Sequence, residues 1–353
     1  MKVDQLTFTR FAAAIIVVIF HYGLKSAPFN NGILHDFMNQ GGDAVSYFFC
    51  LSGYILAQVY YEGDSTALSK RTFFIKRFAR IYPLYFLGFA AALITGLITA
   101  GVLPMGYSII LQMLGLHAWV PGIMLEINYP AWSVSVELLF YACFPFLLSL
   151  FAKRSGRYII NFTLAIWTIS TIIFILLVPN LREEAMIEFT LFFPLLHLNA
   201  FIFGVAANII LKRRFSTIRV SPTISTLVFS AAIILLFFIM GTYNVLVPFL
   251  HNGLLAPIFM LMIISLHVNT GFLSRIFSLR PLVFLGEISY GIYVLQHPVR
   301  MWFEQIIVKY GLELTETFKF YSFVIVLVFA ASVAYFFIER PCRRWITERI
   351  GEK

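Results

Sequence analysis

The chain of 353 residues has little charge, because only 12% of its residues are Asp, Glu, Lys or Arg, about half the share of a soluble globular domain. It has three cysteines, Cys50, Cys143 and Cys342, and no C-x-x-C spacing, so neither a disulfide framework nor a zinc site is indicated. The net charge of +9 lies in short clusters between apolar runs, whereas nucleic-acid-binding domains gather basic residues on one face. Nucleic acid is therefore not expected as a partner.

Several functional motifs are absent as well. The sequence has no G-x-x-x-x-G-K-[ST], no H-E-x-x-H and no G-x-S-x-G, which argues against a P-loop ATPase, a zinc protease and a lipase-type serine hydrolase. No His is followed five residues later by Asp, the spacing of the glycerolipid acyltransferases. The function must therefore be sought in other residues.

Apolar side chains are abundant and make up 60% of the sequence, including 39 Phe. A membrane-spanning helix needs roughly 20 apolar residues, so we predict an all-α, polytopic integral membrane protein with about ten transmembrane helices. The predicted spans lie near residues 8–24, 43–62, 82–101, 132–152, 157–178, 190–211, 223–241, 244–268, 282–301 and 317–338. The segment 104–118 is apolar but short, which predicts an interfacial or re-entrant piece.

The basic residues predict how the chain is oriented. With the N-terminus inside, all but five of the 26 Lys and Arg residues fall in cytoplasmic segments. The five in outer segments are Lys25, Arg182, Arg300, Lys309 and Lys319. This distribution follows the positive-inside rule and predicts that both termini are cytoplasmic. The first apolar run lacks a small-residue cleavage site and is expected to remain as the first span.

The first predicted span carries two unusual side chains, Arg10 and His21. They are eleven residues apart, so an α-helix places them on one face, about 20° apart around the axis and about 16 Å apart along it. One interpretation is an arginine that sets topology and a histidine packed inside the bundle. The other is an active site, because ionisable groups inside a membrane are costly and usually functional, and imidazole is suited to accept a proton.

The segment "YPAWSVSVELLFYACFP" places Glu137 about 7 Å below Trp132 along a helix that enters from the outer face. This depth is similar to that of His21, and a carboxylate beside an imidazole fixes its tautomer and stabilises its protonated form. The alternative is that Trp132 anchors the helix at the membrane interface and Glu137 interacts with the helix dipole.

The segment "KRTFFIKRFARIYPLY" interleaves five cations with aromatic residues, and Arg77 and Arg80 share a helix face. Arginine binds phosphate bidentately, which favours a phosphorylated cofactor, although anionic lipid headgroups are the alternative ligand. Ser52-Gly53 predicts close helix packing. The isolated histidines are expected to be packed polar residues; they are His197, His251 and His267, while His297 lies near the outer end of the ninth span.

Together these segments resemble the acyltransferase-3 family of integral membrane acyltransferases over nearly the whole chain. "TRFAAAIIVVIFH" matches the family's arginine, ten residues, histidine signature, and "FFCLSGYIL" matches F-F-x-L-S-G-[FY]. "RFARIYP" matches R-x-x-R-x-x-P, "WSVSVE" matches W-S-x-x-x-E, and "ISYGIYVLQHP" and "FIERPCRRW" match the C-terminal patterns. Relatives often carry Asp where this chain has Ser46.

The resemblance implies an enzyme, an O-acyltransferase, that passes an acyl group from cytoplasmic acetyl-CoA or another acyl-CoA to an outward-facing sugar hydroxyl of a surface polysaccharide or lipid-linked glycan. Many relatives also carry a fused extracytoplasmic domain, which this chain is too short to hold, so we expect a single transmembrane domain over residues 1–353. We expect it among the lipids of a bacterial inner membrane and without a metal. His21 would act as general base oriented by Glu137, or form a transient acyl-histidine. The phosphates of CoA would be bound by Arg10, Arg77 and Arg80. Substrate-binding or structural roles are expected for Ser52, Gly53, Trp132, Ser133 and His297.

Other functions remain open at this point. A transporter or lipid-linked glycan flippase would use His21 and Glu137 as a proton relay, although matched broken helices in two halves are not apparent. A purely structural membrane protein would leave the buried ionisable groups unused. A membrane-bound O-acyltransferase of the other large fold would use His197 and Asn199 as its polar pair.

Overall fold

The computed structural model of the protein describes residues 4–63, 68–101, 104–214, 220–242 and 250–351. Within these ranges all regular secondary structure is helical, which confirms the predicted all-α class. The longer helices are α1 (Asp4–Tyr22), α3 (Ala44–Tyr60), α4 (Lys70–Ala100), α6 (Trp132–Ala152), α7 (Gly156–Leu177), α9 (Leu198–Arg214), α10 (Pro222–Thr242), α12 (Ala256–Val268), α14 (Arg280–Lys309), α15 (Glu316–Ala334) and α16 (Arg340–Gly351). The shorter ones are α2 (Gly32–Asn39), η1 (Gly41–Asp43), α5 (Gly106–Met113), η2 (His117–Trp119), η3 (Tyr129–Ala131), η4 (Val178–Asn180), α8 (Glu184–Phe192), η5 (Pro194–His197), α13 (Phe272–Phe277) and the π-helix η7 (Tyr335–Glu339).

Among the described residues, seven helices are long and apolar enough to cross a membrane. They span Asp4–Tyr22, Lys70–Thr99, Tyr129–Ala152, Gly156–Asn180, Pro194–Arg214, Pro222–Gly241 and Glu316–Arg349. The other three predicted spans overlap α3, α12 and α14. Helix α3 has 17 residues and α12 has 13, while α14 has 30 residues but includes several charged side chains. The protein is a polytopic membrane protein, and the count of ten stays a prediction.

The structure places some boundaries differently from the sequence. The predicted span 190–211 is divided, because α8 ends at Phe192 and Pro194 begins η5. Segment 104–118 contains the eight-residue α5, which is too short to cross a membrane. The beginning of the predicted span at 244–268, residues 244–249, lies outside the described residues. So do three basic residues of the predicted cytoplasmic segments, Lys2, Arg219 and Lys353.

Local sequence explains where several helices begin and end. The Ser69 side chain accepts a hydrogen bond from the Thr72 backbone N–H at the start of α4, and Ser155 does the same for Tyr158 at the start of α7. Such side-chain caps satisfy backbone donors that a helix leaves unpaired. Helix α4 ends at Ala100 and is followed by Gly101, whose φ of +64° places it in the left-handed region that favours glycine.

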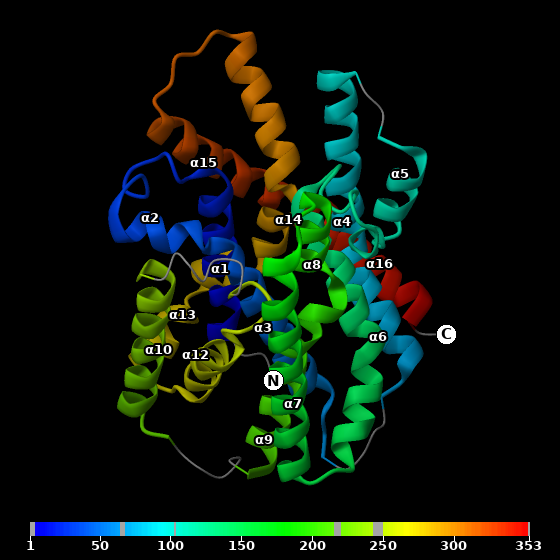
Figure 1. Ribbon diagram of the computed structural model, residues 1–353, viewed down its shortest axis with the longest axis vertical. Helices are drawn as coiled ribbons and strands as arrows, with labels where there is room; N and C mark the ends of the chain where they lie inside the picture. Colours follow the sequence, from blue (N-terminus) through cyan, green and yellow to red (C-terminus); the bar gives the residue numbers. More distant parts are fainter. Residues whose placement is uncertain (1–3, 64–67, 102–103, 215–219, 243–249, 352–353) are drawn as a thin grey trace.

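Helix α1 lies in the middle of the molecule, where it packs against α3, α12, α13 and α14. Figure 1 shows α10, α12 and α13 on one side of this centre and α4, α6 and α16 on the other. Helices α3 and α9 pack especially closely, because a Cβ atom at Gly53 would meet the Phe201 carbonyl and one at Gly204 would meet the Cys50 carbonyl. The close packing predicted for Ser52-Gly53 is therefore confirmed.

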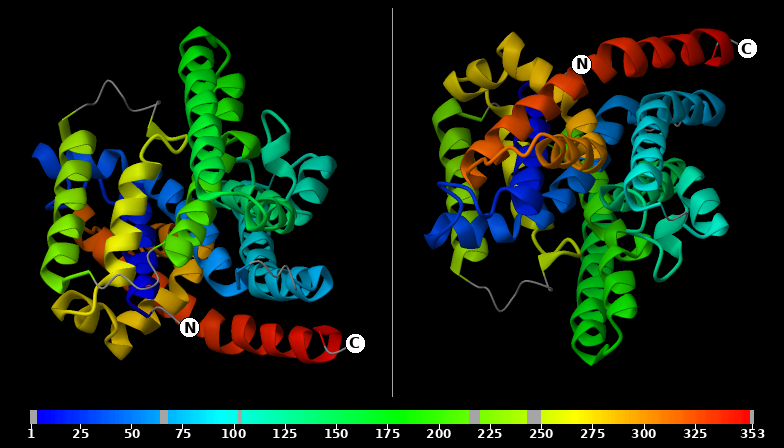
Figure 2. Two further views of the ribbon diagram at one scale, coloured as in Figure 1. Left: turned by 90° about the horizontal axis from the view of Figure 1, so that it is seen from below. Right: turned by 90° about the horizontal axis from the view of Figure 1, so that it is seen from above.

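Helix α16 lies along one edge of the molecule, against α4. Both views in Figure 2 place it at the edge where α1 begins. The start of α1 and the C-terminal helix thus lie at the same end of the fold. The cytoplasmic location of both termini stays a prediction.

Candidate active site

Helix α1 borders two cavities. Arg10 lines a cavity of about 130 Å³, named here the arginine cavity. His21, at the other end of the helix, lines a cavity of about 510 Å³, named here the histidine cavity. Val45 of α3 and Tyr293 of α14 line both cavities and lie between them. One helix therefore brings the predicted phosphate-binding and proton-accepting side chains to two neighbouring cavities.

Three guanidinium groups line the arginine cavity, those of Arg10, Arg77 and Arg80. Within the described residues, neither Arg10 nor Arg77 takes part in an ion pair, and the buried Nε of Arg77 has no hydrogen-bond partner. The cavity also contains one carboxylate, that of Glu137. The excess of positive charge and the unused donors suit a ligand with phosphate groups.

Arg80 already has a partner in the protein. Its Nη1 forms an ion pair and hydrogen bond with Oε1 of Glu339, the last residue of η7, whose side chain is fully buried. Glu339 was not among the predicted site residues, although an acid inside the apolar segment "YFFIERP" is a signal for a buried partner. Arg80 therefore ties α4 to the C-terminal helices at the edge of the arginine cavity.

Glu137 lies in the arginine cavity and not against His21. It shares a face of α6 with Ser133, four residues earlier, and both line this cavity. Its Oε1 accepts a hydrogen bond from the Tyr141 hydroxyl at 3.5 Å. Within the described residues no hydrogen bond or ion pair joins Glu137 to His21, so the expected pairing is not formed. Counting residues along the two helices predicted similar depths in the membrane for Glu137 and His21. It did not fix the direction in which each side chain points.

His21 has a different partner, Gln296 of α14. Its Nδ1 lies 2.9 Å from Oε1 of Gln296, and the amide nitrogen of Gln296 donates to the Tyr293 carbonyl at 2.8 Å. The amide oxygen is thus turned toward the imidazole, and Nδ1–H of His21 must be the donor. The lone pair on Nε2 is left to accept a proton, which is the tautomer that a general base needs. Sequence spacing gave no signal for Gln296.

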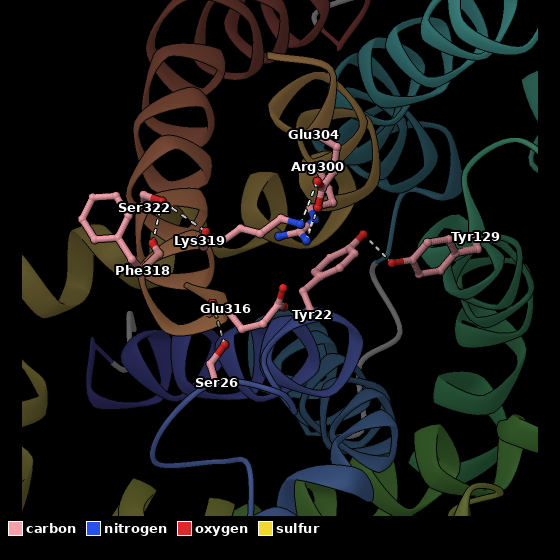
Figure 3. A network of polar contacts seen from close by, with 9 residues as sticks. All are labelled: Tyr22, Ser26, Tyr129, Arg300, Glu304, Glu316, Phe318, Lys319 and Ser322. Carbon is pink, nitrogen blue, oxygen red and sulfur yellow. Dashed lines mark hydrogen bonds and ion pairs between the residues drawn. The ribbon is translucent and has the colours of Figure 1, made fainter. Parts of the chain in front are cut away.

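Aromatic and charged side chains enclose the outer end of α1. The His21 ring lies edge to face with Tyr129, at 4.8 Å between ring centroids, and the Tyr129 hydroxyl donates to that of Tyr22. Arg300 lies over the Tyr22 ring at 5.4 Å and forms an ion pair with Glu304. Figure 3 shows this network continuing through Glu304 to Lys319 of α15, at 2.9 Å. These contacts hold Tyr129 beside His21.

A second imidazole, that of His251, lines the histidine cavity. Its Nδ1 lies 3.4 Å from Oδ1 of Asp43, a carboxylate that is only 3% exposed. The Ser46 hydroxyl, one helical turn after Asp43, donates to the His251 carbonyl at 3.0 Å. The expectation that His251 is only a packed polar residue does not account for this arrangement. Because the partners are about 200 residues apart, only the tertiary fold brings them together.

The remaining residues of the "WSVSVE" and "FFCLSGYIL" motifs divide between the cavities. Trp132 lines the histidine cavity and packs on the His251 ring at 5.5 Å. Ser133 and Ser52 line the arginine cavity, and the Ser133 hydroxyl donates to the Pro130 carbonyl at 3.2 Å. Gly53 serves the packing of α3 on α9 described above. Helix α6, like α1, therefore contributes to both cavities.

Three other predicted residues line neither cavity. The His297 ring lies 4.7 Å from that of Tyr129. His197 Nε2 lies 2.9 Å from the Leu191 carbonyl, and the Asn199 amide donates to the Asn252 carbonyl at 2.8 Å. Both members of the alternative polar pair are thus engaged by backbone. In the described part of the chain, no group of three or more His, Cys, Asp and Glu side chains is arranged to hold a metal ion.

The fold is that of a polytopic membrane protein with ionisable groups on its inner cavities, and comparison with known proteins gives its class as the acyltransferases. A family model described as an acyltransferase domain, that of the acyltransferase-3 family, matches residues 3–337. The chain belongs to this family.

Two curated relatives match it. Acyltransferase MdmB of Streptomyces mycarofaciens is 32% identical over 167 residues, which are 44% of this chain and 42% of MdmB. Peptidoglycan O-acetyltransferase OatA of Listeria monocytogenes is 24% identical over 326 residues, which are 84% of this chain and 49% of OatA. The chain spans about half the length, or less, of these relatives. No solved structure matches it significantly.

Proposed function

We propose that the protein is an O-acyltransferase of a bacterial cytoplasmic membrane. It takes an acyl group, in the simplest case acetyl, from acyl-CoA bound at the arginine cavity. It transfers this group to a sugar hydroxyl of a polysaccharide or lipid-linked glycan in the histidine cavity. The observation that carries the proposal is that α1 borders both cavities, with Arg10 at one and His21 at the other.

The arginine cavity supports binding of the donor. Arg10 and Arg77 have no ion-pair partner inside the described residues, so their donors are available for the phosphates of CoA. Glu137 lies among these guanidinium groups, and its proposed role is to hold them in position, not to orient His21. The acyl end of the donor reaches the histidine cavity by passing Val45 and Tyr293, the residues common to both cavities.

The proposed reaction is direct transfer. His21 Nε2 takes the proton of the acceptor hydroxyl while the hydroxyl oxygen attacks the carbonyl carbon of the thioester. The carbon–sulfur bond then breaks, and the imidazolium returns its proton to the CoA thiolate. The hydrogen bond to Gln296 keeps the imidazole in the required tautomer and orientation throughout. The acetyl group and the glycan acceptor are in keeping with the name of OatA, a peptidoglycan O-acetyltransferase.

The experiment is an acyl-transfer assay with purified protein in lipid nanodiscs, labelled acetyl-CoA and a bacterial surface-glycan extract. We expect acetylated glycan with the wild type. His21→Ala should lower turnover by about 10²–10⁴-fold, the usual contribution of a general base, and should still bind acyl-CoA, because the arginine cavity is unchanged. His267→Ala is the matched control, since this histidine lines neither cavity.

Two outcomes contradict the proposal. Near-normal turnover by His21→Ala would remove the general base. If the wild type acylates no glycan but moves a lipid-linked glycan across the bilayer of a vesicle, the protein is a transporter and His21 serves proton movement instead.

A further inference from the structure

Three polar side chains that the reaction above does not use line one part of the histidine cavity. Gln40 precedes the short helix η1, which connects α2 to α3, and Asp43 is the last residue of η1. His251 lies five residues before the start of α12. Gln40 and Asp43 are each only 3% exposed. They are thus buried as deeply as core residues, although neither is apolar.

Each of the three has a buried polar atom that meets no hydrogen-bond partner among the described residues. These atoms are Nε2 of Gln40, Oδ2 of Asp43 and Nε2 of His251. Almost all buried polar atoms in proteins are hydrogen-bonded, because leaving one unpaired forfeits its hydration without replacement. Three such atoms around one cavity point to a ligand that supplies the missing hydrogen bonds.

The chemistry of the three atoms is mixed. The Gln40 amide nitrogen is a donor and the Asp43 carboxylate oxygen is an acceptor. The His251 Nδ1–H is directed to Asp43 Oδ1, so its Nε2 is a second acceptor. The rest of the cavity is mostly apolar and aromatic, with Phe20, Tyr129, Trp132 and Phe192 in its wall. A few convergent polar groups in an aromatic cavity of about 510 Å³ fit a sugar ring better than an apolar chain.

We propose that Gln40, Asp43 and His251 bind the acceptor sugar through hydroxyls next to the one that is acylated. One hydroxyl accepts from the Gln40 amide and donates to Asp43 Oδ2, and a neighbouring hydroxyl donates to His251 Nε2. The inference rests on the proposed function and deepens it, because it names residues that choose the acceptor. His21 then meets a hydroxyl whose position is set by its neighbours.

The Asp43 carboxylate has two roles in this arrangement. Its Oδ2 contacts the sugar, and its Oδ1 keeps the His251 ring in the tautomer that accepts. Ser46 holds the His251 backbone from the next turn of α3. The sugar-binding residues are therefore supported by hydrogen bonds that do not depend on the ligand.

The test measures transfer kinetics with a purified surface glycan as acceptor and acetyl-CoA as donor. Asp43→Asn, Gln40→Leu and His251→Phe should each raise KM for the glycan by roughly tenfold or more, the usual effect of losing a hydrogen bond to a buried or charged group. KM for acetyl-CoA should not change, because the three residues do not line the arginine cavity. Asp36→Asn, in α2 and lining neither cavity, is the control.

Folding stability separates this role from a structural one. Gln40→Leu removes an amide nitrogen that meets no partner among the described residues. Asp43→Asn replaces the unpartnered Oδ2 but keeps an amide oxygen that can still accept from His251, so the midpoint of thermal unfolding should stay constant or rise in both variants. Unchanged glycan KM in these two variants, a fall in kcat alone, or an equal effect of Asp36→Asn would overturn the inference while leaving acyl transfer intact. If the wild type transfers no acyl group at all, the proposed function fails first and this inference fails with it.

Discussion

The Arg80 guanidinium on α4 forms an ion pair with the Glu339 carboxylate on η7, and the Glu339 side chain has no exposed surface. The partners are 259 residues apart in the sequence. Their contact lies where α16 packs on α4. It joins the "RFARIYP" and "FIERPCRRW" segments into one unit at the edge of the arginine cavity.

We expect Glu339→Ala to destabilise the protein strongly. Removing one partner of a buried ion pair leaves the other charge uncompensated, which typically costs about 3–5 kcal/mol. Thermal unfolding in detergent should show the loss as a lower midpoint. Glu348→Ala is the control, because its ion pair with Arg344 is exposed and should not affect the midpoint measurably. Equal midpoints for Glu339→Ala and the wild type would contradict a stabilising role for the buried ion pair.

Arg77 should contribute to donor binding without contributing to stability. It lines the arginine cavity, and its Nε meets no partner in the described part of the chain. Arg77→Ala should therefore weaken acetyl-CoA binding by roughly tenfold or more, the usual value of a charged hydrogen bond. Calorimetry measures the affinity. Lys76→Ala, one residue earlier and exposed, is the matched control. Equal affinities of Arg77→Ala and the wild type for acetyl-CoA would indicate that these cations bind lipid headgroups instead.

Arg80→Ala should differ from Arg77→Ala, because it should also lower stability by leaving Glu339 without its ion-pair partner.

Much of the fold follows from sequence because hydrophobicity and charge act locally. Apolar runs predicted helices where α1, α4, α6, α7, α9, α10 and α15 are found, and capping residues such as Ser155 lie where helices begin. The close contact at Gly53 was also predictable, since small residues permit it. Whether α3 and α14 cross the membrane is harder to decide from composition, because α3 is short and α14 carries charged side chains.

The site was predictable only where its residues share a helix. Arg10 and His21 could be related by helical geometry, and so could Arg77 and Arg80. Partners from distant segments could not, because their contacts depend on how each helix is rotated and packed. Glu137 is the instructive case: its depth was estimated well enough to suggest His21 as a partner, yet the rotation of α6 directs it to the arginine cavity with Ser133. Asp43 and Gln296 carried no spacing signal at all.

Gln296 should matter for the chemical step. Gln296→Leu removes the acceptor for Nδ1–H of His21, which leaves a buried donor unpaired at a cost of about 1–3 kcal/mol and frees the ring to adopt the other tautomer. We expect kcat for acyl transfer to fall by roughly tenfold or more, with acetyl-CoA affinity retained. Gln112→Leu removes a buried amide that lines neither cavity and controls for general loss of packing. A normal kcat in Gln296→Leu would show that His21 does not need this partner.

The connection between the two cavities can be tested at Val45, which is 4% exposed and lines both. Val45→Phe places a larger side chain between the donor and His21, so the acyl carbon should no longer reach the acceptor. Because misplacing reacting groups by about 1 Å can lower the reaction rate about 100-fold, transfer should fall by roughly that factor, while acetyl-CoA still binds at the arginine cavity.

Val18→Phe is the control. It overpacks α1 at a fully buried site that lines neither cavity, and both substitutions should cost about 1–3 kcal/mol of stability. Val45→Ala should keep transfer and increase acetyl-CoA hydrolysis, since the passage becomes wider. If Val45→Phe transfers as fast as Val18→Phe, the acyl group does not pass between Val45 and Tyr293, and donor and acceptor must meet elsewhere.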